Sequence, residues 1–99
     1  MVKSKVVWTN RAESELTQVL NFYLERNGNN RYSLKLLSII EKAVRLLQRH
    51  PFIGRISDDY RSRVLTKREF LIFYEVSESR IEILSVWDRR QDPKLRIEN

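Results

Sequence analysis

Three β-prone runs follow one another in the last third of the chain: Arg61-Ser-Arg-Val-Leu-Thr-Lys-Arg68, Phe70-Leu-Ile-Phe-Tyr-Glu-Val76 and Ile81-Glu-Ile-Leu-Ser-Val-Trp-Asp-Arg-Arg-Gln-Asp-Pro93. Each run is short and rich in β-branched or aromatic residues, a pattern typical of consecutive antiparallel strands. Two basic pairs, Lys67-Arg68 and Arg89-Arg90, flank these runs. In a meander both pairs lie at the same end of the sheet, so a polyanion or an acidic protein is the first partner to consider.

The region before these runs predicts a strand and a first helix. Residues 2–8 alternate as a short strand does. Asn10 can cap the helix that follows, and Glu13, three residues later, can complete a capping box. Apolar residues then repeat at helical spacing until Gly28, which accepts the left-handed conformation that ends a helix.

A second helix and a loop are predicted next. Asn29 or Asn30 can cap this helix, and Pro51 ends it by disfavouring helical geometry at His50. The two helices form an antiparallel hairpin, and residues 52–60 form a loop.

These elements predict one α+β domain over residues 1–99. It consists of an N-terminal strand, an antiparallel helical hairpin and a three-stranded antiparallel meander, all strands forming one twisted sheet. Residues 1–94 form its core, and we expect residues 95–99 to be a frayed tail.

Composition narrows the class of protein. The chain has no cysteine, which excludes disulfides, thiolate metal sites and a cysteine nucleophile. Its 19 basic and 13 acidic residues give a net charge of +6, which favours a nucleic acid or an acidic protein as partner and leaves both open. No apolar run approaches the roughly 20 residues of a membrane span. Since residues 1–9 also lack the apolar core of a signal peptide, we expect a cytoplasmic protein.

The strand register decides which residues share a face. With a turn over residues 77–80, the expected opposed pairs are Phe70 with Trp87, Ile72 with Ser85, and Tyr74 with Ile83. This apolar face is assigned to the helices. A two-residue turn after Lys67 would bury Arg61 and Arg63 on it without partners. We therefore expect a shift of one residue, with Val64 inward and Arg61, Arg63 and Lys67 outward.

The opposite face is then too apolar to be left bare in water. It holds Arg61, Arg63, Leu65, Leu71, Phe73, Leu84, Val86 and Asp88. We expect a partner to cover it.

Compact catalytic motifs are absent from the sequence. The single histidine, His50, is interpreted as a partner of the second helix's C-terminal dipole, and Asp58-Asp59 as loop acids. Neither predicts a metal site, and no cofactor is expected. Trp87 can stack on a base at the basic end of the sheet or cap the core.

The order and spacing of all these segments, including Pro51-Phe-Ile-Gly54, resemble the RelE/ParE superfamily of type II toxin–antitoxin toxins over nearly the whole chain. Two biochemical classes share that fold. RelE-like members are ribosome-dependent ribonucleases that cut mRNA. ParE-like members act by binding DNA gyrase.

The nuclease site implied by the resemblance is incomplete here. Arg61, Arg63 and Arg89 match its basic positions, but Leu71 and Asp88 stand where RelE-like members carry basic residues. Cleavage by the 2′-hydroxyl needs a proton acceptor and a donor besides cations. Asp88 or a displaced glutamate is the candidate acceptor, and Arg61, Arg63, Asp88 and Arg89 are the catalytic candidates if the chain is a nuclease. The ParE-like branch is favoured because proton-transfer groups are missing and because the chain carries the ending Arg89-Arg-Gln-Asp-Pro93.

The resemblance also implies partners. A co-encoded acidic antitoxin that folds on binding would cover the open face through Leu65, Leu71, Phe73, Leu84 and Val86. The target, gyrase or the ribosome with its mRNA, would contact Lys67, Arg68, Trp87, Arg89 and Arg90. The chain would contact operator DNA only through the antitoxin. A third possibility is an inactive toxin fold that serves as a DNA-binding corepressor.

Overall fold

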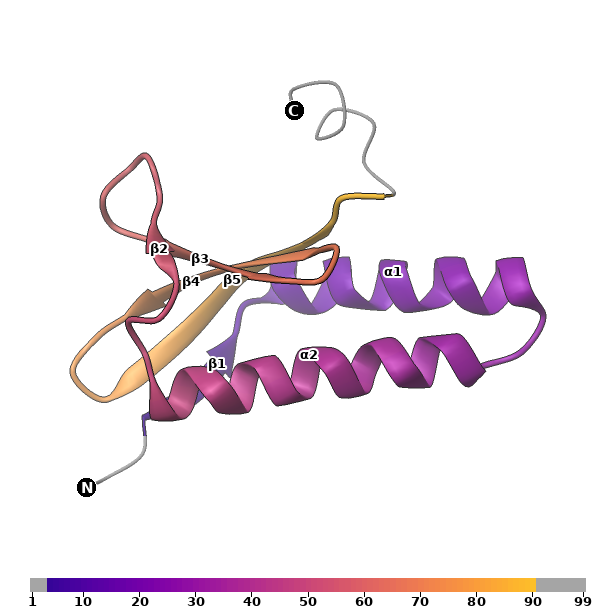
Figure 1. Ribbon diagram of the computed structural model, residues 1–99, viewed down its shortest axis with the longest axis horizontal. Coiled ribbons are helices and arrows are strands. Elements are labelled where there is room, and N and C mark those ends of the chain that lie inside the picture. The colour runs from indigo at the N-terminus through magenta and orange to yellow at the C-terminus, as the bar shows by residue number, and fades with distance from the viewer. Residues whose placement is uncertain (1–3, 91–99) are drawn as a thin grey trace.

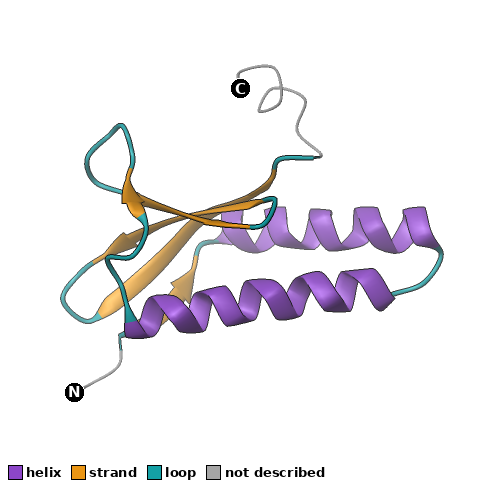
Figure 2. Ribbon diagram, in the orientation of Figure 1, coloured by secondary structure: helices purple, strands orange, loops and turns teal. Residues whose placement is uncertain are grey.

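Two antiparallel helices cover one face of a five-stranded sheet in the computed structural model, which describes residues 4–90 (Figure 1). Within residues 4–90 the other face of the sheet carries no helix (Figure 2). The elements are β1 Lys5–Trp8, α1 Asn10–Asn27, α2 Arg31–Arg49, β2 Arg55–Ile56, β3 Arg63–Lys67, β4 Phe70–Val76 and β5 Arg80–Asp88. The α+β class and the helical hairpin predicted from sequence are confirmed. Residues 2 and 3 of the predicted first strand and the predicted tail 95–99 lie outside the described residues.

Helix α1 is capped by Thr9 rather than by Asn10. The Thr9 hydroxyl accepts a hydrogen bond from the Ala12 N–H at 3.1 Å, and its extended backbone (φ −72°, ψ 158°) is that of an N-cap. The prediction was one residue late because both residue types cap well. At the other end Gly28 adopts a left-handed φ of 71° and ends the helix as expected.

Helix α2 ends at Arg49, directly before His50 and Pro51, as predicted. Its N-terminus has Asn30 in the cap position without a side-chain bond, and the Asn29 side chain instead accepts from the Arg31 N–H at 3.1 Å. The buried face of α2 consists of Ser33, Leu36, Ile40, Ala43 and Leu47. This face packs into the core against α1 and the sheet.

The sheet is mixed, with strand order β1-β5-β4-β3-β2. The meander β3-β4-β5 is antiparallel as predicted, whereas β1 pairs with β5 in parallel. The segment predicted as a plain loop contains the two-residue strand β2, which pairs with β3. Where β1 ends, Glu15 of α1 accepts hydrogen bonds from the Val86 N–H at 3.1 Å and the Ser85 hydroxyl at 2.6 Å. Glu15 thereby satisfies part of an otherwise open strand edge.

A β-bulge between β4 and β5 changes the expected register. Tyr74 does pair with Ile83, but Phe73 pairs with Ser85, so Leu84 is an extra residue without an opposite partner. Beyond the bulge, Ile72 faces Val86 instead of Ser85, and Phe70 faces Asp88 instead of Trp87. The inward side chains of β4 are nevertheless those predicted, since Phe70, Ile72 and Tyr74 are all buried.

The turn between β3 and β4 was predicted wrongly. The strands are joined by the two-residue turn Arg68-Glu69, with Lys67 opposite Phe70. Arg68 has a φ of 56°, the left-handed value that such hairpins require at the first turn position. Leu65, not Val64, therefore shares the helix-covered face with Ile72.

Arg63 escapes the expected penalty of this register because it finds partners. It pairs with Tyr74 on the inward phase, yet its Nη1 donates to the carbonyl oxygens of Phe52 at 3.1 Å and Gly54 at 2.8 Å. Its guanidinium also lies 5.0 Å from the centre of the Phe52 ring. The loop after α2 thus supplies the acceptors that the sequence argument lacked.

Gly54 lies against the buried ring of Tyr74. Its N–H donates to the Tyr74 hydroxyl at 2.9 Å, and a Cβ at this position would lie 2.6 Å from that oxygen and 2.9 Å from the Val64 carbonyl oxygen. Burial raises the pKa of Tyr74, although this hydrogen bond and the nearby Arg63 oppose the rise. Tyr74 is a core residue that holds the loop to the sheet.

We predict that Gly54→Ala lowers the free energy of unfolding by about 2–3 kcal/mol, because the added methyl group collides with a buried ring and a backbone oxygen. Urea unfolding followed by circular dichroism measures this. Gly28→Asn is the matched control and should change stability by less than about 0.5 kcal/mol, because asparagine tolerates the left-handed conformation. Equal unfolding midpoints for the two variants would contradict the close approach at Gly54.

Candidate functional site

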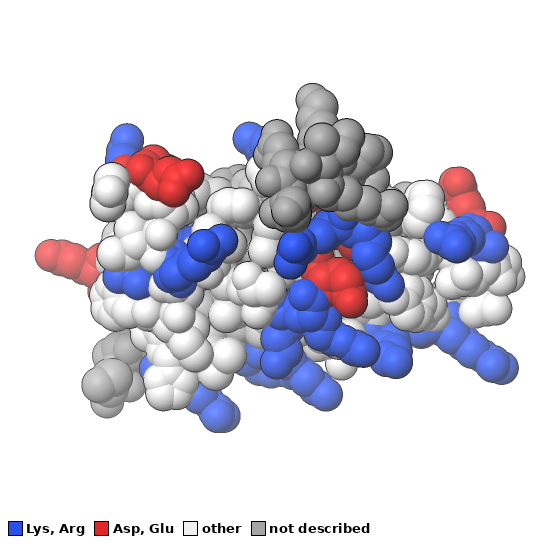
Figure 3. Space-filling model, turned by 45° about the horizontal axis from the view of Figure 1, so that its top comes forward, with Lys and Arg blue, Asp and Glu red and all other residues white. Residues whose placement is uncertain are grey.

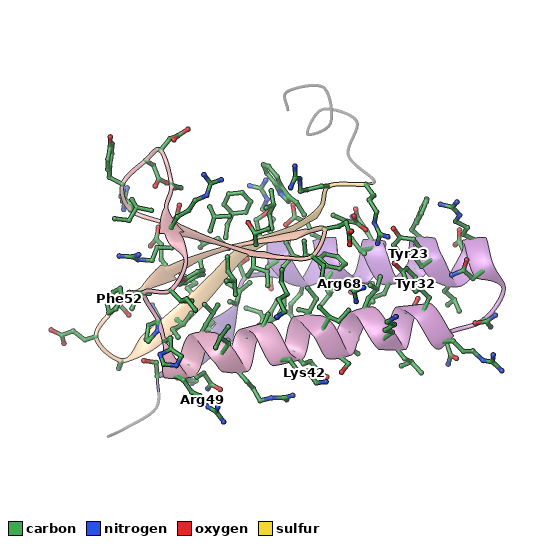
Figure 4. The ribbon with its side chains drawn as sticks, viewed as in Figure 1. Tyr23, Tyr32, Lys42, Arg49, Phe52 and Arg68 are labelled. Carbon is green, nitrogen blue, oxygen red and sulfur yellow. The ribbon has the colours of Figure 1, made fainter. Side chains whose placement is uncertain are left out.

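Four cations gather at the end of the sheet where β3 turns into β4 and β5 ends. This basic rim consists of Lys67, Arg68, Arg89 and Arg90. The Arg89 N–H donates to the Glu69 carbonyl oxygen at 2.9 Å, which holds the end of β5 against the turn. The prediction that both basic pairs lie at one end is confirmed. In Figure 4 Arg68 is labelled at this end of the sheet, and Tyr23 and Tyr32 are labelled close to it.

The rim cations are not equivalent. Lys67, Arg68 and Arg89 are exposed, whereas Arg90 folds back toward the helices. Its guanidinium carbon lies 5.3 Å from the centre of the Tyr23 ring and 5.8 Å from that of Tyr32. Arg90 therefore ties the rim to the helical hairpin.

The pKa of Arg90 lies above its usual value. Burial opposes the charge, but a hydrogen bond with Tyr32 and the nearby carboxylate of Asp88 outweigh this penalty. Arg90 keeps its charge throughout the physiological range.

Asp88 is buried beneath the rim, with its residue only 3% exposed. The Tyr23 hydroxyl donates to Oδ2 at 3.1 Å, and the Arg90 N–H and Nε donate to Oδ1 at 2.9 and 3.5 Å. The expectation that Asp88 lies on the outward face is wrong, because the bulge reverses the phase of β5. A carboxylate with these partners is a structural anchor between β5 and α1.

The nuclease candidates do not come together. Arg61 is exposed in the loop before β3, and Arg63 is bonded to the loop after α2. Arg63 and Lys67 stand four residues apart on an extended strand, which separates them by about 14 Å. Arg89 lies beside the turn that follows Lys67. The two candidates on the β3 side are therefore at the opposite end of the strand from Arg89.

The face of the sheet away from the helices presents an apolar patch. The register places Thr66, Leu71, Phe73 and Trp87 on this open face, and the rings of Phe73 and Trp87 lie 4.7 Å apart. All except Thr66 are half-buried. Trp87, which was expected to face the helices, is thus available on the open side.

Two residues expected on the open face belong to the core instead. Leu65 is 9% exposed and Val86 is 1% exposed, and both pack among the residues between sheet and helices. The tight β3–β4 turn places Leu65 on the inward side, and the bulge does the same for Val86. Leu84, the extra residue of the bulge, is half-buried.

The adjacent acids Asp58 and Asp59 lie in the loop before β3. The Asp59 carboxylate accepts from the N–H groups of Ser62 and Arg61 and from the Ser57 hydroxyl, and these bonds lower its pKa. Within residues 4–90 no group of three or more acids and histidines is placed to hold a metal ion. No helix in that range is long and apolar enough to cross a membrane.

Sequence reasoning missed the helical side of this site. Tyr23 and Tyr32 occupy apolar positions in the helical spacing of the sequence, but their rings lie 4.8 Å apart and both contact the guanidinium of Arg90. Glu15 was not singled out at all. The only signal was the presence of polar groups on otherwise apolar helical stripes.

Comparisons with known proteins agree on one family. The model of the ParE toxin of the type II toxin–antitoxin system parDE matches residues 6–93. A solved structure described as the chromosomal ParDE toxin–antitoxin system from P. aeruginosa matches with a TM-score of 0.74 and 26% identity, over 85% of this chain and 94% of that one. A search of curated proteins found no significant match to the sequence.

We predict that Asp88→Asn lowers the free energy of unfolding by about 2 kcal/mol, because the amide cannot replace a carboxylate that receives charge-assisted bonds. Tyr23→Phe should cost about 1 kcal/mol, and the double variant should cost less than the sum because the two residues share one bond. Urea unfolding measures all three. Asp58→Asn, an exposed carboxylate, is the control and should stay within about 0.5 kcal/mol of the parent chain. Strict additivity would contradict the Tyr23–Asp88 link.

Proposed function

We propose that this chain, which belongs to the ParE toxin family and is the toxin component of a type II toxin–antitoxin system, arrests growth by binding DNA gyrase and is neutralised by a co-encoded antitoxin. Asp88 gives the main support for binding, rather than RNA cleavage, as the mode of action. It is the only acid among the catalytic candidates, and it is buried and already bonded to Tyr23 and Arg90. A proton acceptor must reach its substrate, which this carboxylate does not.

The basic rim supports binding as the mode of action. Lys67, Arg68 and Arg89 are exposed side by side on backbone that is fixed by the Arg89–Glu69 hydrogen bond. Arg68 is held at a left-handed φ of 56°, which is costly for a residue with a side chain. Such strain is concentrated at functional positions, where the surrounding structure keeps it in place.

The open face supports an antitoxin partner. Leu71, Phe73 and Trp87 form an apolar patch next to three exposed cations. A segment that is apolar and acidic, and that folds as it binds, matches both features. The net charge of +6 favours an acidic partner for the same reason.

We predict that the purified chain inhibits supercoiling by purified gyrase and that Arg68→Gly weakens the inhibition by about tenfold or more, because a charged anchor is lost. The same substitution should raise the free energy of unfolding by about 0.5–1 kcal/mol, since glycine relieves the strained φ. Tyr60→Gly is a matched control: Tyr60 also has a positive φ, 59°, but lies in the loop before β3. It should gain stability and leave inhibition unchanged.

Induced expression without antitoxin, followed by pulse labelling, separates the proposal from its alternatives. Gyrase binding predicts early loss of DNA synthesis and a DNA-damage response, with protein synthesis failing late. Immediate translation arrest with mRNA cut on ribosomes would establish the ribonuclease instead, and Arg89→Ala should then abolish cutting. Normal growth would favour an inactive corepressor.

For the antitoxin, we predict that Phe73→Glu weakens binding by at least about 100-fold, because a charge is placed at the centre of the apolar patch. Isothermal titration calorimetry with the co-encoded protein measures this. Leu34→Glu is the control, because Leu34 is an exposed leucine on α2, away from the sheet. Equal losses for the two variants would remove the open face as the antitoxin site.

A further inference from the structure

The exposed side of α2 carries a row of five cations. This α2 stripe consists of Arg31, Lys35, Lys42, Arg45 and Arg49, all exposed. At 3.6 residues per turn the five positions fall within about 80° of the helix circumference and extend over roughly 27 Å. The one acid of α2, Glu41, lies outside this arc. Within the described part of the chain, none of the five cations forms an ion pair.

Apart from Arg49, whose charge favours the dipole in the last turn, the stripe does not stabilise the helix. Lys42, Arg45 and Arg49 follow one another at spacings of three and four residues, where like charges repel. Arg31 lies in the first turn, which contains no acid and where a positive charge opposes the helix dipole. Helix α1, by comparison, mixes both signs and pairs Arg11 with Glu15 at 3.4 Å. A helix that only needed a soluble surface would be expected to alternate its charges in the same way.

The stripe points away from the sheet. It lies opposite the side of α2 that buries Leu36, Ile40 and Leu47. Figure 4 shows Lys42 and Arg49 projecting from α2 on the side away from the strands. In Figure 3 Lys and Arg side chains follow the lower edge of the view, where α2 runs. A partner seated on the open face would therefore leave the stripe accessible.

We propose that the α2 stripe binds the sugar-phosphate backbone of duplex DNA directly, in contrast to the expectation that DNA is contacted only through the antitoxin. A row of cations without an acid among them complements a row of phosphates, and such contacts position a protein without reading sequence. The stripe holds no aromatic residue on which unpaired bases could stack, which disfavours a single strand. The apolar face of α2 is buried in the core and is not free to enter a membrane.

This surface is distinct from the basic rim and does not depend on gyrase as the target. A chain that leaves gyrase untouched can still bind duplex DNA, and a chain that inhibits gyrase can fail to do so. The two proposals are therefore tested separately.

The test is the salt dependence of binding to a fluorescein-labelled 20-base-pair duplex, measured by fluorescence anisotropy with the full chain. Five phosphate contacts predict a slope of log K against log salt of about −4.5, or a loss of about 500-fold in affinity between 50 and 200 mM salt. Lys42→Gln/Arg49→Gln removes two contacts, so its slope should fall to about −2.7 and its loss to about 40-fold.

Arg11→Gln/Arg55→Gln is the control with the same net charge, because both arginines are exposed and lie on other elements. It should keep the slope of the parent chain. The proposal is overturned if the parent chain does not bind at 50 mM salt, or if both pairs of substitutions change the slope equally. Tighter binding to a duplex RNA of the same length, or to phosphatidylglycerol vesicles, would overturn it as well.

Discussion

The β-bulge between β4 and β5 decides what each face of the sheet presents. Because Leu84 has no opposite partner, the residues after it are shifted by one position relative to β4. Val86 and Asp88 then face the helices, while Trp87 joins Leu71 and Phe73 on the open face. Without the bulge, Asp88 would be an exposed acid beside exposed arginines and Trp87 would be a core residue.

The buried Asp88 has consequences for the whole rim. It fixes Tyr23 of α1 and the backbone and side chain of Arg90, which in turn stacks on Tyr23 and Tyr32. The end of the sheet is thereby attached to the helical hairpin, and three cations remain exposed on a rigid edge. A rigid edge of cations suits recognition, because little ordering entropy is lost when a partner binds.

Three surfaces result, and they face different directions. The open face is apolar, the rim at its end is basic, and the α2 stripe lies on the far side of the helices. An antitoxin that covers the open face and reaches the rim would therefore exclude a target from the rim, whereas the α2 stripe would stay accessible to a polyanion.

Local signals predicted much of this fold from sequence. The helical hairpin, the end of α1 at Gly28 and the three inward residues of β4 follow from spacing and turn chemistry. The basic rim follows from the order of the strands. The bulge did not, because no local pattern marks it and the carboxylate beside it belongs to the distant Glu15, which accepts from Val86 and Ser85.

The position of Arg63 was missed for the same reason. Its acceptors are the backbone carbonyl oxygens of Phe52 and Gly54, and no pattern of side chains in the sequence predicts such bonds. The bulge put Val86, Trp87 and Asp88 on the face opposite to the predicted one, and the tight β3–β4 turn did the same to Leu65.

The register of β5 is the most direct test, and NMR measures it. Nuclear Overhauser effects between backbone protons of Ile72 and Val86, and of Tyr74 and Ile83, with Leu84 unpaired, are the predicted result. Pairing of Ile72 with Ser85 and of Phe70 with Trp87 would contradict the account, because Asp88 would then face solvent and become available as a proton acceptor.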